Sequence, residues 1–279
     1  MSSLYNPSLS IISIINNGHS IIAVHGLNGD RENSWTAANG VNWLHNLLPG
    51  DMPNTRVLSW GYSLTTVGNS NKKISQQQVS EQLVYDLWEM RSSTNVQTQL
   101  TQQENKNYLG GAIVKSRVVI DYRQALLYAD SAQETSTTDL RSIRLSTRGA
   151  IFMGTPELDS RLIGLQSYLA NAEGSEQESS DIYKEAHWLS YPSIGKQFWT
   201  LFVHETLDSL STNSILDQPV VDYLLTSCLN KTASFSPQEN SSHISIQADH
   251  NGMINFESSL DKGYLKIKEH LVYVEKMLQ

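Results

Sequence analysis

The chain has almost no cysteine, a deficit of positive charge and no long hydrophobic run. Cys228 is the single cysteine among 279 residues, so an intrachain disulfide cannot form and nothing indicates secretion. The 28 acidic residues outnumber the 20 basic ones, and the formal net charge is −8. This argues against a nucleic-acid partner, because phosphate binding requires clustered Lys and Arg. The longest apolar patch, Leu9 to Val24, is interrupted by Asn16 to Ser20, so we expect no transmembrane segment.

Other absences narrow the expected class of protein further. Neither a signal peptide nor an Arg-rich transit segment is present, so we expect a cytoplasmic protein. No cluster of His, Cys and Asp has metal-ligand spacing, and no glycine-rich loop carries the lysine of a phosphate-binding motif. We therefore expect neither a metal nor a cofactor. The length fits one large α/β domain over residues 1–279, with residues 1–8 as a flexible N-terminus and 171–182 as an exposed, lid-like connection.

Short β-branched runs alternate with amphipathic helical segments along the chain. The predicted strands are Leu9–Ile15, Ser20–Val24, Thr55–Ser63, Gly149–Met153, Gln197–Glu205, Gln218–Tyr223 and His243–Ile246. The predicted helices include Val79–Met90, Gln124–Asp130 and Lys262–Leu278. This order predicts an α/β fold in which helices flank a mostly parallel sheet. Ser20–Val24 runs directly into His25-Gly26, at the carboxyl end of a strand, where open α/β sheets place ligand sites.

The stretch from Asn107 to Lys115 resists a simple interpretation. Leu109-Gly110-Gly111 followed by Ala-Ile-Val predicts a tight turn that opens a helix, like the second half of a G-x-S-x-G nucleophile elbow, but Tyr108 occupies the serine's position. Residues 92–106 are too polar for a buried central strand, since each unpaired amide would cost about 2 kcal/mol. Residues 116–123 contain a Val-Val-Ile core that prefers a strand, as if inserted into a helix. We therefore predict a disrupted central strand.

Several colinear motifs carry a family resemblance. They are Ile21 to Asp30, Ser34-Trp35-Thr36, Arg56 to Tyr62, Phe152 to Pro156 and Asp249 to Phe256. In these motifs the chain is similar to the lipase/serine-esterase-like α/β-hydrolases, of the kind found at the N-terminus of fungal NLR-type proteins and related to the GPI inositol deacylases. The resemblance implies an α/β-hydrolase-like fold and an acyl ester or lipid substrate. It also implies mitochondrial or endoplasmic-reticulum association as the alternative to a cytoplasmic location.

The resemblance assigns candidate roles to an acid–base pair. His250 lies in the motif that carries the family's catalytic histidine, so it is the predicted base. The carboxylate that orients it would follow the preceding strand, and Asp222 is the first choice and Glu205 the second. Asp249 is not taken as the acid, because it would face away from His250 in an extended loop.

The same resemblance leaves the nucleophile missing. It implies that the oxyanion donors are backbone N–H groups around Gly26, Leu27 and Leu109. Tyr108 stands where the serine is expected, and a phenol with a pKa near 10 on a long rigid arm is a poor substitute. Three interpretations remain open. The chain is a catalytically impaired ester hydrolase, or a non-enzymatic pseudo-hydrolase domain that binds a ligand or protein partner, or residues 92–124 depart from the true transcript and a serine-bearing exon is missing.

Overall fold

The computed structural model describes residues 8–13, 19–26, 29–62, 76–99, 108–115, 120–132, 139–154, 194–207 and 240–277. The predictions made for Leu27, Asp222, residues 171–182 and the strand at Gln218–Tyr223 lie outside these ranges. Ser8, which was expected to belong to a flexible N-terminus, instead opens the first strand.

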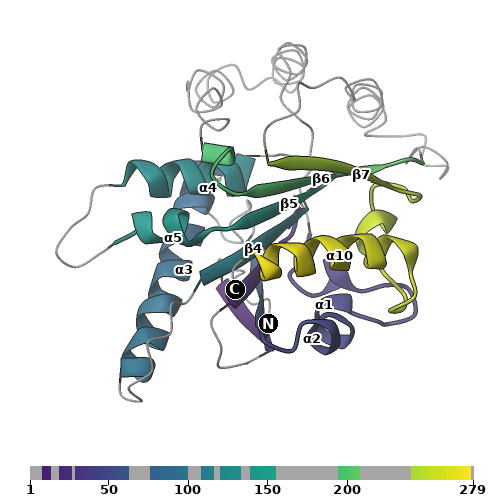
Figure 1. Cartoon of the computed structure of the whole chain (residues 1–279), viewed down its shortest axis with the longest axis horizontal. Helices are drawn as coiled ribbons and strands as arrows, with labels where there is room; N and C mark the ends of the chain where they lie inside the picture. The colour runs from purple at the N-terminus through teal and green to yellow at the C-terminus, as the bar shows by residue number, and fades with distance from the viewer. Residues whose placement is uncertain are drawn as a thin grey trace, which may run out of the picture.

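The described residues form a sheet with helices on both sides (Figure 1). The strands are β1 (Ser8–Ser13), β2 (His19–Val24), β3 (Thr55–Gly61), β4 (Tyr108–Lys115), β5 (Gly149–Met153), β6 (Trp199–Glu205) and β7 (Ser241–Ile246). The helices are α1 (Trp43–Asn46), α2 (Leu48–Asp51), α3 (Gln76–Gln99), α4 (Ile120–Ser131), α5 (Arg141–Ser146) and α10 (Lys262–Lys276), with short 3₁₀ turns at Asn33–Trp35 and Gly252–Ile254.

The seven described strands have the order β1-β3-β2-β4-β5-β6-β7. β1 is antiparallel to β3, and every other neighbouring pair is parallel. Chain connections therefore run outward from the centre in both directions, from β2 to β3 on one side and from β4 to β7 on the other. The predicted fold class, an α/β-hydrolase-like mostly parallel sheet flanked by helices, is confirmed by this topology.

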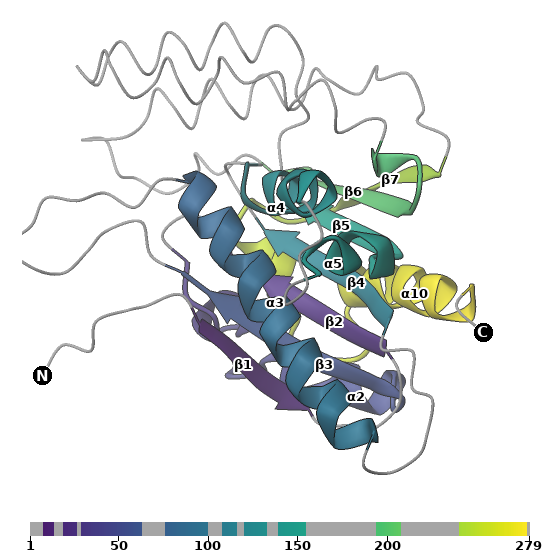
Figure 2. The ribbon, with the colours of Figure 1, turned by 90° about the vertical axis from the view of Figure 1, so that its left-hand side faces the viewer.

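Each face of the sheet carries its own helix layer and its own core. α3, α4 and α5 cover one face, and α1, α2 and α10 cover the other (Figure 2). Along β2, β3, β5 and β6, side chains alternate between the two cores, as the period of two requires. In β5, for example, Phe152 packs toward α3 and α4, whereas Ile151 and Met153 pack toward α1 and α10. Burial on both faces explains why these strands are continuous apolar runs. Among the described helices, none is both long and apolar enough to cross a membrane.

The central strand is where the structure departs most from the sequence-based expectation. Tyr108–Lys115, predicted as a turn followed by a helix, is β4, which pairs with β2 on one side and β5 on the other. The prediction of a turn and helix here is wrong. A register shift opposite Ser20–Ile21 leaves Gly110 unpaired as a bulge, so the central strand is irregular but present. Polar residues 92–99 belong to the end of α3, and no buried strand is built from them.

The segment after β4 also differs from the prediction. Of the strand-like segment 116–123, residues 116–119 lie outside the described residues, and Ile120 to Arg123 form the first turn of helix α4. Tyr122, Ala125 and Leu126 lie buried in the core shared with α3. Packing of these three residues outweighs the modest β-propensity of Ile120.

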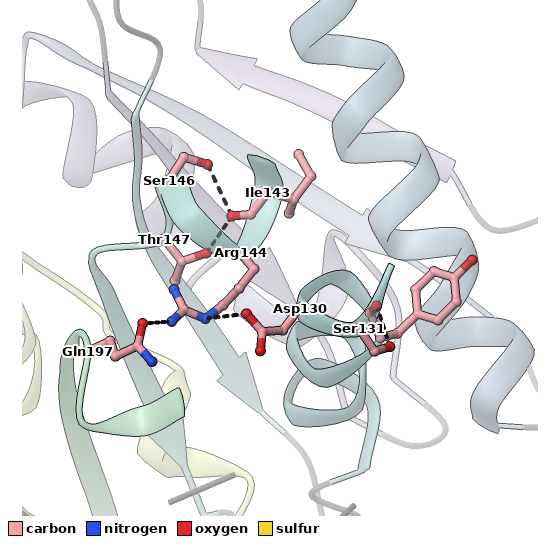
Figure 3. A network of polar contacts seen from close by, with 8 residues as sticks. Asp130, Ser131, Ile143, Arg144, Ser146, Thr147 and Gln197 are labelled. Atoms are coloured by element: carbon pink, nitrogen blue, oxygen red, sulfur yellow. Dashed lines mark hydrogen bonds and ion pairs between the residues drawn. The ribbon is translucent and has the colours of Figure 1, made fainter. Parts of the chain in front are cut away.

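A buried arginine connects α5 to its neighbours (Figure 3). Arg144 is 3% exposed, donates through Nη2 to the side-chain oxygen of Gln197, and lies 3.8 Å from the Asp130 carboxylate through Nε. Its guanidinium also sits over the ring of Phe198. Because Asp130 lies on α4 and Gln197 just before β6, this one side chain fixes three elements relative to one another.

Candidate active site

The carboxyl ends of the parallel strands lie together along one edge of the sheet. The register pairs Val24 of β2 with Val114 of β4, Lys115 with Met153 of β5, and Met153 with Val203 of β6. The residues that follow these ends are therefore brought to the same edge, which is the usual ligand side of such sheets. His25-Gly26, Gly154, Glu205 and the loop that carries His250 all lie there.

His250 and Glu205 form a buried pair at this edge. Nδ1 of His250 lies 3.2 Å from Oε1 of Glu205, and the two side chains are 8% and 7% exposed. Glu205 is the last residue of β6, and His250 follows β7, the neighbouring strand. Of the two carboxylates proposed from the sequence, Glu205 is thus the one that the described structure brings to His250.

The electrostatics of the pair favour an ionised carboxylate. Burial is the largest influence and raises the pKa of the Glu205 carboxyl, but the hydrogen bond and charge interaction with His250, a backbone hydrogen bond and the charge interaction with His204 together lower it by more. The pKa of Glu205 therefore lies below its ordinary value. A carboxylate that stays charged in a buried place can orient a histidine and stabilise its protonated form.

The loop around His250 is fixed from both ends. Asp249 Oδ1 accepts a hydrogen bond of 2.7 Å from the Gly252 N–H, so this carboxylate stabilises the loop's own turn. Trp43 Nε1, from the buried start of α1, donates to the Ile254 carbonyl at 2.8 Å.

Gly154 packs closely against the imidazole ring of His250. It follows β5 with φ +60°, a left-handed conformation that favours glycine. A Cβ at this position would lie 2.7 Å from Cε1 and 2.8 Å from Nδ1 of His250, and 2.9 Å from Sδ of Met253. His250 therefore packs directly on the backbone at the end of β5, next to the end of β4.

Gly26 lies at the same edge, two strands away from β5. It is buried, and its carbonyl accepts a hydrogen bond of 2.9 Å from the Gly29 N–H. Leu27, the other residue predicted to supply an oxyanion donor here, lies outside the described residues.

Tyr108 and Leu109 lie at the opposite edge of the sheet. Tyr108 is the first residue of β4 and pairs with His19, the first residue of β2. At about 3.3 Å per residue, it is roughly 23 Å from Lys115 at the other end of the strand. The assignments of Tyr108 to the nucleophile position and of Leu109 to the oxyanion site are therefore wrong in this structure, because both residues precede the strand that should lead to the elbow.

Two histidines contact each other near Glu205. His204 Nε2 and His243 Nδ1 are 3.2 Å apart, and the ring planes differ by 3°. The two ring centroids are 5.5 Å apart, which equals the distance between the two nitrogens plus the two ring radii. The rings therefore lie in one plane, edge to edge, and the N–H of one ring points at the nitrogen lone pair of the other. The contact is thus a hydrogen bond and leaves no room for an ion between the rings. Within the described residues, no three His, Cys, Asp or Glu side chains gather as metal ligands.

Comparisons with known proteins add a general likeness of architecture. No family model matches the chain, and a search of the curated proteins finds no match. Among solved structures, it is similar to the Pyrococcus furiosus esterase Pf2001, with 12% identity, a TM-score of 0.42, and coverage of 94% of this chain and 81% of that one. An inhibited esterase B from Lactobacillus rhamnosis shares 13% identity and a TM-score of 0.46 over 95% of this chain and 79% of its own.

Thermogutta terrifontis esterase 2, phosphonylated by sarin, is similar at 12% identity and a TM-score of 0.46, covering 97% of this chain and 90% of that one. Likenesses at this level concern the overall arrangement of strands and helices.

One residue of the site went unrecognised in the sequence. In the sequence, Gly154 is only one residue of the motif from Phe152 to Pro156, although a glycine directly after a buried strand can indicate a close approach of the backbone to another group. Its contact with His250 joins residues 96 positions apart in the chain, which no local pattern encodes.

Proposed function

We propose that the chain is a serine-type carboxylic ester hydrolase that acts on acyl or lipid esters. The observation that carries the proposal is the 3.2 Å contact between His250 Nδ1 and Glu205 Oε1, made by two buried side chains at the carboxyl edge of the sheet. A carboxylate on Nδ1 keeps the proton there, so Nε2 presents the lone pair of a general base. Glu205 then stabilises the imidazolium that forms when Nε2 accepts a proton.

In this proposal the nucleophile comes from the residues after β4. His250 packs on Gly154 after β5, and β4 is the strand between β5 and the loop at the end of β2. Lys115, the last residue of β4, pairs with Met153 beside Gly154. Ser116 is the next residue in the sequence and lies outside the described ranges. We take Ser116 as the candidate nucleophile, because it directly follows Lys115 in the sequence.

The chemistry of the proposal is acyl transfer in two steps. Ser116 Oγ attacks the ester carbonyl carbon while its proton passes to His250 Nε2. The tetrahedral intermediate collapses, the C–O bond to the alcohol breaks, and the alcohol leaves with that proton. Water then attacks the acyl-enzyme in the same way and releases the carboxylic acid. The backbone N–H groups of the turn that begins at Gly26 stabilise the negative oxygen in both steps.

The family resemblance and the strand register name different nucleophile positions. The resemblance aligns Leu109-Gly110-Gly111 with the elbow and leaves Tyr108 in place of the serine. On that alignment the chain has no nucleophile and is a non-enzymatic domain that binds a ligand or a protein partner. The register instead brings Lys115 to the site and makes Ser116 the residue to test.

Hydrolysis of p-nitrophenyl acetate and p-nitrophenyl butyrate separates these alternatives. We expect Ser116→Ala and His250→Ala to lower kcat by at least about 10³, and Glu205→Gln by about 10³ to 10⁴, since each change disables one member of the triad. His45→Ala, at an exposed histidine of α1, is the matched control and should retain full activity. Loss of activity in His250→Ala but not in Ser116→Ala would move the nucleophile elsewhere. Wild-type turnover no faster than buffer would refute the hydrolase and leave the binding domain.

A further inference from the structure

Two tyrosine side chains meet where α3 and α4 pack together on one face of the sheet (Figure 2). Tyr85 lies within α3 and is 42% exposed, and Tyr128 lies within α4 and is half-buried. The Tyr128 hydroxyl donates to the Tyr85 hydroxyl oxygen at 3.5 Å, in a contact that is open to solvent. The two residues are 43 positions apart, and the chain between them contains β4, the central strand.

The two phenol rings lie side by side with their hydroxyl ends together. Their centroids are 6.4 Å apart, and their planes are inclined by 50°. Two phenols that met end to end through their hydroxyls would hold their centroids farther apart, because each hydroxyl extends outward from its ring. The axes of the two rings therefore converge toward the oxygens, which brings the ring carbons ortho to the hydroxyls together as well.

The helices hold both rings in this arrangement. Tyr128 packs against the core that α3 and α4 share with the sheet. On α3, Leu83, Val84 and Leu87 are buried in the same core around the position of the other tyrosine. Each ring is thus carried by a helix whose inner face is anchored. The contact between the rings therefore belongs to the fold of the two helices.

The hydroxyl contact also gives the protons of the pair a way out. The hydrogen bond to Tyr85, burial, and the charges of Tyr85 and Glu81 raise the pKa of Tyr128 to about 12. Tyr128 is therefore a neutral phenol at physiological pH, and it must lose a proton when it loses an electron. Its proton lies in the hydrogen bond to Tyr85, whose side chain is exposed to water.

We propose that Tyr85 and Tyr128 form an oxidative cross-linking site, at which a one-electron oxidant of the peroxidase class joins the two phenols into dityrosine. Each phenol gives up one electron and its hydroxyl proton and becomes a tyrosyl radical. The radicals couple through their ortho carbons and form a C–C bond. Each coupled carbon then loses its hydrogen to solvent, and each oxygen regains a proton. One hydrogen peroxide accepts the two electrons and the two released protons and becomes two water molecules.

The cross-link supplies a covalent bond that the sequence cannot make with cysteine, because Cys228 is the single one. It joins α3 to α4 and closes a loop that contains all of β4. A bond that closes a long loop stabilises the fold by restricting the unfolded chain. We expect the Tm of the cross-linked monomer to rise by about 5–15 °C. The site is independent of the ester-hydrolase function proposed above.

Treatment of the dilute protein with a peroxidase and hydrogen peroxide tests the proposal. We expect a monomer that has lost the mass of two hydrogens, shows dityrosine fluorescence and yields one cross-linked peptide pair containing Tyr85 and Tyr128. Tyr85→Phe and Tyr128→Phe keep the rings and should each abolish all three signals. Tyr273→Phe is the matched control, because Tyr273 is 41% exposed and packs on Trp199, and it should cross-link like the wild type.

Four results would overturn the proposal. They are the absence of this peptide pair from the oxidised wild type, dityrosine that forms only between molecules, a signal that survives in both phenylalanine variants, and a cross-linked monomer whose Tm equals that of the untreated protein. None of these readouts requires an ester substrate.

Discussion

Replacing Gly154 by alanine tests the link between backbone conformation and the His250–Glu205 pair. Gly154 has φ +60°, and an added Cβ would lie 2.7 Å from His250 Cε1 and 2.8 Å from the Nδ1 that bonds Glu205. Contacts this short cannot persist, so the imidazole or the end of β5 must shift. The substitution therefore strains the backbone and displaces the histidine at the same time.

The magnitude follows from two contributions. The left-handed conformation costs a non-glycine residue about 1–2 kcal/mol, and overpacking a buried site costs about 1–3 kcal/mol. Together they predict a loss of about 2–5 kcal/mol in the free energy of unfolding. Gly40→Ala is the matched control, because Gly40 has φ +84° but no atom within 4 Å of an added Cβ. Gly40→Ala should lower the free energy of unfolding only by the cost of the left-handed backbone conformation, about 1–2 kcal/mol.

Urea unfolding of the two variants and the wild type measures this difference. A second readout is the pKa of the Glu205 carboxyl, followed by NMR. Burial raises this pKa, and several contacts together lower it by more, with the hydrogen bond to His250 the largest of them, so displacing His250 should raise the pKa. Equal destabilisation by Gly154→Ala and Gly40→Ala, with an unchanged Glu205 pKa, would refute the claim that His250 rests on Gly154.

Three further predictions concern stability. Burial lowers the pKa of His270 to about 4, so the neutral imidazole supports the full free energy of unfolding above pH 6.5, and this free energy falls as the pH drops toward 4. His270→Leu should reduce the fall in the free energy of unfolding between pH 7 and pH 4 by up to about 3 kcal/mol, as measured by urea unfolding at both pH values. Asp51→Asn should lower the free energy of unfolding by about 1 kcal/mol at pH 7, because the carboxylate accepts hydrogen bonds of 2.6 Å from Lys268 and Tyr264. Below the lowered pKa of Asp51 the substitution should have no effect on this free energy, which a pH series of thermal melts checks. Arg144→Met should lower the free energy of unfolding by about 1–2 kcal/mol in chemical denaturation, because it removes the hydrogen bond to Gln197 and the ion pair with Asp130, whereas both partners stay accessible to water.

Much of the sheet could be predicted from local sequence. Runs such as Ser20–Val24 and Gly149–Met153 are apolar on both faces, and their strand conformation follows from burial alone. The closing helix was equally clear, because Tyr264, Ile267, Leu271 and Val274 repeat at helical spacing and all are buried.

The central strand could not be predicted in the same way. Gly110-Gly111 favours a turn locally, yet the segment is a strand because β2 and β5 offer paired backbone groups on both sides. The partner of Tyr108 is His19, far away in the chain, and no window around Tyr108 contains it. Placing the elbow at Gly110-Gly111 therefore assigned the wrong end of the strand to the site.

The sequence by itself determined the class of fold and most of the described strands, because hydrophobic periodicity is a local feature, and the motif around His250 made this residue the candidate base. Only the tertiary structure decided that Glu205 is the carboxylate beside His250, that Gly154 supports it, and that Tyr108 lies at the far edge of the sheet. Asp222 and Glu205 each follow an apolar run and are equivalent as sequence. The pairing of β6 with β7 brings Glu205 to His250, whereas Asp222 lies outside the described residues.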